Sequence, residues 1–270
     1  DPRSAKSVAN NNVAIGYQAM QYGENGVAGR SANIAIGYNT LRGKSTGAAR
    51  PNANFNVAIG AESLYTNDTS FNTSVGFKSM NKNVDASSNV AIGWKTLYSG
   101  ISGQFNVALG AESLYYADNS FNTALGFRTL YSNKSDNNTA IGFKSSFSNV
   151  NGTNNISIGS ESLYSNIDAS ENISIGSQSL YNNDSSYNIA IGHQALGNGH
   201  STAFTAYENV AIGHNVMNYG GNMVSSVAIG STAGLYATGS YNTFVGAEAG
   251  KGGTTSAPFS SGQNNTAVGY

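Results

Sequence analysis

The sequence contains no cysteine, 3 histidines and 3 prolines among its 270 residues. The lack of cysteine excludes a disulfide framework, a thiolate metal site and a cysteine nucleophile. Charged residues make up only 10% of the chain, and 13 basic against 14 acidic side chains leave a net charge of −1. Binding to nucleic acid or to a membrane surface needs clustered Lys and Arg, so we predict neither partner. No apolar run approaches the roughly 20 residues of a membrane-spanning helix, so we predict no membrane insertion.

A five-residue unit recurs along nearly the whole chain: Asn, a β-branched residue, a small residue, an aliphatic residue and Gly. Its copies end at Gly16, Gly37, Gly60, Gly76, Gly93, Gly110, Gly126, Gly142, Gly159, Gly176, Gly192, Gly213, Gly230, Gly246 and Gly269. From Gly60 to Gly192 the copies are always 16 or 17 residues apart, which is typical of a solenoid and not of a globular enzyme.

We therefore predict an all-β fold, a parallel β-solenoid of about 15 short coils, one for each copy of the unit. A lead-in segment at residues 1–11 would precede a single repeat domain at 12–269. Longer spacings between copies predict insertion loops near 21–33, 42–55, 197–208 and 251–265, and such loops commonly carry recognition.

Apolar residues alternate within each unit, which predicts a short strand with one aliphatic face. Ile, Val or Leu precedes every Gly of the unit. A second apolar residue, usually Leu, lies four positions after most of them, and Ser146, Gly234 and Gly250 interrupt this second ladder. We interpret each coil as two short strands that turn both apolar ladders into a narrow core. The predicted core ladder comprises Ile59, Val75, Ile92, Leu109, Leu125, Ile141, Leu64, Leu97, Leu114 and Leu130.

Asn begins every unit except one, in which Ser226 replaces it. Asn tolerates left-handed backbone and bonds nearby backbone groups, which suits a corner that leads into a strand, and stacked Asn side chains can also bond one another. The predicted corner ladder comprises Asn56, Asn72, Asn89, Asn106, Asn122 and Asn138. We favour this structural role over ligand binding, and we expect each repeated Gly to lie where φ is positive or where a Cβ would clash.

The position two residues after each Gly carries charges of both signs. Adjacent coils lie about 4.8 Å apart, so opposite charges on neighbouring coils should pair. The predicted pairs are Glu62 with Lys78, Lys95 with Glu112, Glu112 with Arg128, and Lys144 with Glu161. The predicted charge ladder comprises Glu62, Lys78, Lys95, Glu112, Arg128, Lys144 and Glu161. Exposed pairs contribute only about 0–1 kcal/mol each, so we expect them to set register. Because the acids alternate with bases and do not converge on a cleft, we predict no catalytic residues.

Aromatic residues recur after the Gly, after the Leu and before the Asn, as in Trp94, Tyr98 and Phe105. We favour packing between coils or chains for these columns, and a platform for sugar rings is the alternative. A single Asp lies in the later turn of six copies: Asp68, Asp85, Asp118, Asp136, Asp168 and Asp184. One carboxylate in a turn suits an Asx-turn better than a calcium ladder. His193 and His214 share one repeat position on adjacent coils, and we predict neither a metal site nor a cofactor.

The units Asn-Val-Ala-Ile-Gly at 12–16, 56–60, 89–93 and 209–213 resemble the head repeats of YadA-like trimeric autotransporter adhesins. The longer unit at 106–115 is also similar to repeats of phage and algal-virus fibre proteins. This resemblance extends over residues 12–269, although the period is longer than in the adhesin heads. It implies a left-handed β-roll and a parallel homotrimer, for which we expect the Ala/Ser column or an aromatic column at the seam between chains.

These observations favour a non-enzymatic extracellular fibre or adhesin segment, a rigid rod that presents or spaces a host-attachment surface on a virion or bacterial cell. We favour a viral (phage) tail or capsid fibre because the Tyr-rich, long repeat fits that resemblance better; the head of a bacterial trimeric adhesin is the alternative. An ice- or surface-binding solenoid fits less well because Thr is sporadic in the strands, and a polysaccharide-cleaving solenoid fits less well because short coils have little room for a groove. The expected partners are further copies of the chain, neighbouring fibre segments and a host glycan or protein.

Overall fold

The computed structural model describes residues 11–21, 31–43, 53–116, 118–197, 206–219, 223–253 and 261–270. The chain forms two compact units, Asp1–Lys134 (unit one) and Ser135–Tyr270 (unit two), and each is described by itself. Residues 1–10 of the predicted lead-in segment lie outside the described residues, and so do the parts of the four predicted insertion loops at 22–30, 44–52, 198–205 and 254–260. Within the described ranges the chain forms strands and turns and no helix.

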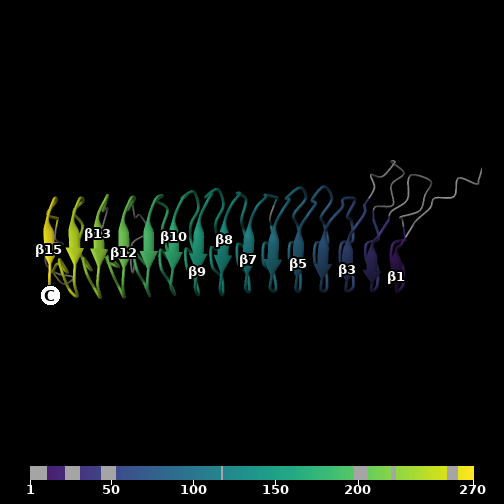
Figure 1. The fold of residues 1–270 in the computed structure, drawn as a ribbon, viewed down its shortest axis with the longest axis horizontal. Coiled ribbons are helices and arrows are strands. Elements are labelled where there is room, and N and C mark those ends of the chain that lie inside the picture. The colour runs from purple at the N-terminus through teal and green to yellow at the C-terminus, as the bar shows by residue number, and fades with distance from the viewer. Residues whose placement is uncertain are drawn as a thin grey trace, which may run out of the picture. The chain divides into compact units, whose positions relative to one another are not determined.

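The described residues of unit one form seven strands of three residues each. They are β1 (Val13–Ile15), β2 (Ile34–Ile36), β3 (Val57–Ile59), β4 (Thr73–Val75), β5 (Val90–Ile92), β6 (Val107–Leu109) and β7 (Thr123–Leu125). Each pairs in parallel with the next strand along the chain, in a register that places equivalent repeat positions opposite one another, such as Ala91 opposite Ala108 (Figure 1). Parallel neighbours joined by one turn of chain are the arrangement of a β-solenoid.

In the described part of unit two, eight strands have the same arrangement. They are β8 (Thr139–Ile141), β9 (Ile156–Ile158), β10 (Ile173–Ile175), β11 (Ile189–Ile191), β12 (Val210–Ile212), β13 (Val227–Ile229), β14 (Thr243–Val245) and β15 (Thr266–Val268). These strands are also parallel and in register. The predicted all-β parallel solenoid is confirmed in both units, and β-branched residues at the strand positions explain why the chain is extended there.

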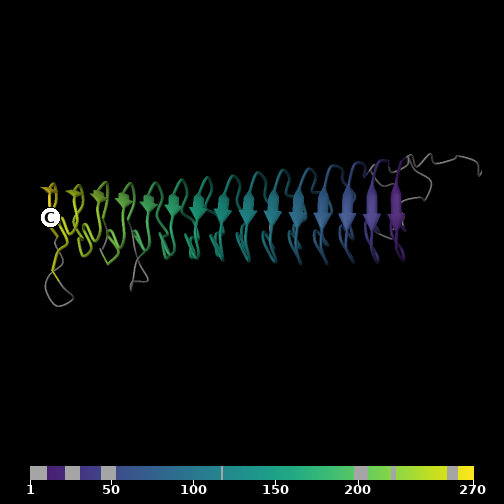
Figure 2. The same ribbon diagram turned by 60° about the horizontal axis from the view of Figure 1, so that its bottom comes forward.

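The segment after each Gly is a turn and not the predicted second strand (Figure 2). In the rung of Gly110, φ is +54° at Glu112 and +49° at Leu114, and the equivalent residues of the other rungs share this left-handed backbone. Ser113 and Leu114 are adjacent and both fully buried, which a strand would not allow because its side chains alternate between faces. Hydrogen bonds to both neighbouring rungs offset the strain: Glu112 N donates to Trp94 O (2.9 Å) and Leu114 N donates to Thr129 O (2.9 Å).

The core forms from the turn and from the middle residue of each strand. Leu64, Leu97, Leu114 and Leu130 are fully buried, where the sequence analysis expected them. The middle residue of each strand from β2 to β14 also faces inward and is buried. This residue is Ala or Ser in every one of these strands except β14, where it is the larger Phe244. The predicted Ala/Ser column at a seam between chains is therefore wrong, because these side chains line the interior of the coil.

The other half of the predicted core ladder faces outward. The prediction that these strand residues are buried is wrong for Ile59, Val75, Ile92, Leu109, Leu125 and Ile141, which are exposed or half-buried. A three-residue strand places its two end side chains on one face and its middle side chain on the other. Because the Leu of the turn already fills the narrow interior, only a small strand residue fits beside it, and the two large residues face outward.

Candidate binding surface

The predicted Asn corner ladder forms inside both units. Asn106 N donates to Asn89 Oδ1 (2.8 Å), and the Asn106 side-chain amide donates to Asn119 O (2.6 Å). Equivalent bonds join successive rungs from Asn33 to Asn122 and from Asn138 to Asn265, with Ser226 in the place of one Asn. The left-handed residue at this corner is the one before the Asn, such as Phe105 with φ +57°, and not the Asn itself. These buried amides hold the coil together and do not form a ligand site.

Two further buried columns escaped the sequence analysis, although both follow the repeat period. The first is a Ser or Thr three residues after the Gly; Ser162, for example, donates to Ser174 O (3.0 Å) across the interior. The second is a buried Asn seven residues after many of the Gly residues; the Asn166 amide donates to Asn149 Oδ1 (2.9 Å) and to Ala169 O (2.8 Å). The constant offset of these residues from the Gly was the signal that would have revealed them.

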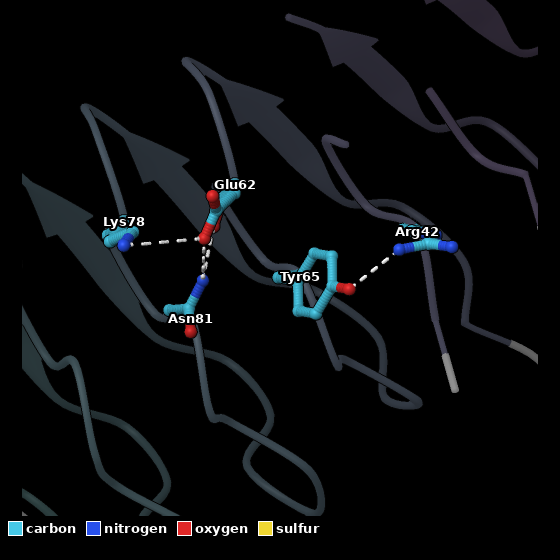
Figure 3. Close-up of polar contacts among 5 residues, drawn as sticks. All are labelled: Arg42, Glu62, Tyr65, Lys78 and Asn81. Carbon is cyan, nitrogen blue, oxygen red and sulfur yellow. Dashed lines mark hydrogen bonds and ion pairs between the residues drawn. The ribbon is translucent and has the colours of Figure 1, made fainter. Parts of the chain in front are cut away.

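The charge ladder forms at two of its predicted pairs. Lys78 Nζ lies 3.7 Å from Glu62 Oε2, and Asn81 donates to the same carboxylate (3.4 Å) (Figure 3). Arg128 Nε lies 2.6 Å from Oε2 of Glu112, whose side chain is only 8% exposed. Figure 3 also shows Arg42, which donates to the Tyr65 hydroxyl (2.7 Å) on the next rung. Both ion pairs join adjacent rungs, which suits a role in register.

The predicted pairs Lys95–Glu112 and Lys144–Glu161 do not form ion pairs among the residues that the structure describes. Arg128 occupies the carboxylate of Glu112, and Gln178 donates to Glu161 (3.0 Å). The two lysines lie over aromatic rings instead. Lys144 Nζ is 5.2 Å from the ring centroid of Phe143, and Lys95 Nζ is 4.8 Å from that of Trp94. The electron-rich ring faces attract these ammonium groups.

Aromatic rings of adjacent rungs stack on the surface of both units. In unit one, the ring of Tyr115 lies 5.1 Å from those of Tyr98 and Tyr131. Stacked pairs also include Tyr17–Tyr38, Phe55–Phe71, Phe105–Phe121, Phe147–Tyr164, Tyr164–Tyr181 and Tyr219–Tyr236. Partial burial, followed by the neighbouring tyrosines, raises the pKa of Tyr115 above its ordinary value. Stacking of this kind stabilises adjacent rungs and leaves many ring faces in contact with solvent.

The Asp and His side chains on the turns contact neighbouring rungs. Asp118 and Asp184 each accept a hydrogen bond from a backbone N–H of the preceding rung, at Ile101 (2.6 Å) and Ile167 (2.8 Å), so these side chains join adjacent rungs. The rings of His193 and His214 stack 5.3 Å apart and are exposed. Within the described ranges no three His, Asp or Glu side chains lie close enough together to hold a metal ion.

Comparisons of the chain with family models, with curated proteins and with solved structures give no match. The described part of the chain also contains no helix with the length and hydrophobicity to cross a membrane. The candidate surface therefore rests on its own geometry: an outward aliphatic face on the strands, and a column of charged and aromatic side chains on the turn that follows.

Proposed function

We propose that the chain is a segment of a non-enzymatic extracellular fibre or adhesin that assembles as a parallel homotrimer through the outward face of its strands. The observation that carries the proposal is the aliphatic stripe on this face. Val107 is 46% exposed and Leu109 is 43% exposed, and the equivalent residues of the neighbouring strands are exposed or half-buried. Monomeric soluble proteins rarely leave a continuous apolar surface of this kind uncovered.

The regularity of the stripe favours a second copy of the same chain as its partner. Strands repeat about every 4.8 Å, so two parallel copies can interdigitate their outward side chains in one register along a whole unit. Complete burial of a Val, Leu or Ile side chain contributes about 1.5–3 kcal/mol, so even half of that at each strand would stabilise an assembly. The resemblance to trimeric adhesin heads and viral fibres supports three chains and a left-handed coil.

Three charged side chains of the ladder, Glu62, Glu112 and Lys144, have structural partners on the surface of the coil. The Glu62 and Glu112 carboxylates pair with the cations of the next rung, and Lys144 lies over phenyl rings. The surface column therefore fits presentation and attachment better than acid–base chemistry. We favour a viral tail or capsid fibre, with the head of a bacterial trimeric adhesin as the alternative. In either case the chain would lie on the exterior of the virion or cell.

The oligomeric state tests this proposal through a matched pair of substitutions. Ile92→Lys places a charge on the strand face, whereas Ile101→Lys makes the same change at a 51% exposed side chain later in the same rung, outside the strand. We expect light scattering to give the mass of a trimer for the wild-type chain and for Ile101→Lys, and a smaller mass for Ile92→Lys. A monomeric wild-type chain at micromolar concentration would overturn the assembly, and so would a trimer that Ile92→Lys leaves intact.

Two activity measurements address the other classes of solenoid. Thr73, Thr123, Thr139, Thr243 and Thr266 occupy the first strand position, whereas the other ten strands have Val or Ile there. Because this outward column is mainly aliphatic and irregular in Thr, we expect no thermal hysteresis. We also expect no cleavage of polysaccharide. A clear signal in either assay would overturn the proposal in favour of an ice-binding or a polysaccharide-degrading protein.

A further inference from the structure

Two neighbouring rungs of unit one bring together Lys82, Trp94, Lys95 and Tyr98, which we call the Trp94 cluster. Lys95 Nζ lies 4.8 Å from the ring centroid of Trp94 and 5.7 Å from that of Tyr98. Lys82 Nζ lies 5.3 Å from the same Tyr98 centroid. A backbone hydrogen bond from Lys82 N to Tyr98 O (3.0 Å) fixes the two rungs beside each other. One tyrosine ring is thus shared by two ammonium groups.

The positive charge of the Trp94 cluster is not neutralised by a carboxylate. Lys78 and Arg128, which occupy the same charge column, each form an ion pair with an acid. Neither Lys82 nor Lys95 forms an ion pair with any carboxylate in the described ranges. Cation–π contacts hold the two ammonium groups in place, but a ring carries no net charge to cancel theirs. The cluster therefore retains two positive charges in a chain with a net charge of −1.

The cluster also offers an aromatic face to solvent. Trp94 is the only tryptophan of the chain, and it is 44% exposed, while Lys82 is exposed at the edge of the cluster. An exposed indole face packs well against the C–H face of a pyranose ring. An ammonium group forms strong charge-assisted hydrogen bonds with a carboxylate. A ligand that uses both features needs a sugar ring and a negative charge within one or two residues.

We propose that the Trp94 cluster binds a carboxylate-bearing saccharide, with the sugar ring against Trp94 and the carboxylate bound by Lys82 and Lys95. The inference rests on the proposed attachment function and names the chemical class of its ligand. A neutral sugar would leave the two cations unused, and a small inorganic anion would leave the indole unused. Sialic acids and uronic acids share the required chemistry.

Unit two supplies a matched control for the cluster. Lys144 occupies the same repeat position as Lys95 and lies 5.2 Å from the ring centroid of Phe143 and 5.8 Å from that of Phe147. The backbone and the cation–π geometry are therefore similar, but the indole is replaced by a phenyl ring. Lys144→Gln removes the same charge from an equivalent position outside the Trp94 cluster.

Tryptophan fluorescence of the full chain reports on the cluster directly, because Trp94 is its only indole. We expect a saturable change in emission with 3′-sialyllactose or with trigalacturonate, and whichever acid saturates identifies the source of the carboxylate. Lactose and sodium sulfate at the same concentrations should give no saturable change. Lys82→Gln and Lys95→Gln should each raise the Kd at least tenfold, whereas Lys95→Arg and Lys144→Gln should leave it within twofold of the wild type.

Each contrary result has a defined meaning. No saturation with either acidic saccharide overturns the proposal, and so does an equal response to lactose or to sulfate, since the latter would indicate an adventitious anion only. An equal loss of binding in Lys144→Gln also overturns it, because the effect would then be one of general charge. Circular dichroism of each variant verifies folding. Light scattering on the same samples separates this proposal from the fibre assembly: a trimer without saccharide binding contradicts only the former, and a monomer that binds saccharide contradicts only the latter.

Discussion

The ring of Phe244 fills the space that the Leu of the turn occupies in other rungs, because position 250 in the same rung is glycine. A Cβ at Gly250 would overlap with the Phe244 ring, and a Cβ at Gly234 of the preceding rung would lie 3.0 Å from its Cδ2 atom. Phe244 is buried, and it is the one large residue at a position that elsewhere holds Ala or Ser. The large and small positions have thus been exchanged between strand and turn, and the interior stays filled.

This exchange predicts a compensating pair of substitutions. Phe244→Ala should destabilise unit two by about 3–5 kcal/mol because it leaves a cavity beside the two glycines. Gly250→Leu alone should also destabilise it, through overlap with the ring. The double variant should recover at least half of the loss from Phe244→Ala, since the φ of +60° at Gly250 is close to the +46° to +51° of the ladder leucines of unit two. Urea denaturation of the three variants completes the cycle, and additive losses would contradict the exchange.

A pair of substitutions in one rung tests which strand face is buried. Leu114→Asp places a carboxylate in the fully buried turn ladder between Leu97 and Leu130, whose aliphatic side chains cannot offset its desolvation. We expect Leu114→Asp to lower the free energy of unfolding by several kcal/mol. Leu109→Asp, on the outward face, should lower it by less than about 1 kcal/mol when the chain is monomeric. Urea denaturation below the concentration of assembly measures both. The opposite order would mean that the coil has its faces reversed.

The repeated glycines are required for two reasons, a positive φ and the close approach of the next rung. Gly246 and Gly269, on neighbouring rungs of unit two, allow the two reasons to be tested apart. Gly246 has a φ of +128°, and an added Cβ would overlap with the Gly269 carbonyl; Gly269 has a φ of +122°, and an added Cβ would have no atom within 4 Å. Gly269→Ala should therefore lower the free energy of unfolding only through backbone strain, by about 1–3 kcal/mol. Gly246→Ala should introduce the same strain and also push the rungs of β14 and β15 apart. Hydrogen exchange of the amides of β14 and β15 should show loss of protection for Gly246→Ala. Equal effects of the two substitutions would leave φ as the sole constraint.

The Asn ladder predicts a pH-dependent variant. Asn172 accepts a hydrogen bond from Asn188 N (2.9 Å) and donates one to Asn155 Oδ1 (3.2 Å). In Asn172→Asp the ionised side chain cannot donate a hydrogen bond, and it faces the Asn155 Oδ1 acceptor in a buried site. We therefore expect the free energy of unfolding to fall by about 3 kcal/mol at neutral pH. Burial should raise the pKa of the new carboxyl in the folded state, so stability should rise as the pH falls and the group becomes a donor.

Asn172→Ser is the matched control for that variant. Ser226 already occupies the equivalent position in another rung, and its Oγ accepts a hydrogen bond from Asn242 N (3.1 Å). We therefore expect Asn172→Ser to cost about 1 kcal/mol without a strong pH dependence. Thermal unfolding across a range of acidic and neutral pH distinguishes the variants, and a pH-independent loss in Asn172→Asp would contradict the proposed role of the amide donor.

The stacked tyrosines predict a loss of stability at alkaline pH. Burial raises the pKa of Tyr115 in the folded chain, and the neighbours Tyr116, Tyr98 and Tyr131 raise it further. As the pH rises, the Tyr115 hydroxyl therefore loses its proton in the unfolded chain before it does so in the folded chain. The contribution of Tyr115 to the free energy of unfolding is fully present below about pH 10 and is lost as the pH rises through the pKa of the folded state. Ultraviolet titration of the phenolate should show late ionisation that moves to lower pH in Tyr131→Phe. Ionisation at the ordinary value in both proteins would contradict this.

The repeat by itself determined where the strands lie and how they pair. Each Asn-to-Gly unit combines a corner residue, a β-branched extended residue and a glycine that adopts positive φ, so local chemistry alone predicts the strand at every copy. The near-constant spacing then fixes the register, because identical units stack best when equivalent positions meet. The corner ladder at Asn89 and Asn106 followed from the same logic and is present.

Only the tertiary structure decided which side of each strand faces inward. The alternation of Val107, Ala108 and Leu109 is equally consistent with two large residues in the core or with one small residue there. The turn places Ser113 and Leu114 side by side in the interior, through left-handed backbone that the sequence pattern does not reveal, and the remaining width admits only Ala108. The tertiary structure also decided which cation pairs with which acid. Arg128 forms the ion pair with Glu112, and Lys95 lies over the ring of Trp94 instead. Interior width and competition between neighbours are properties of the assembled coil, so no single repeat contains them.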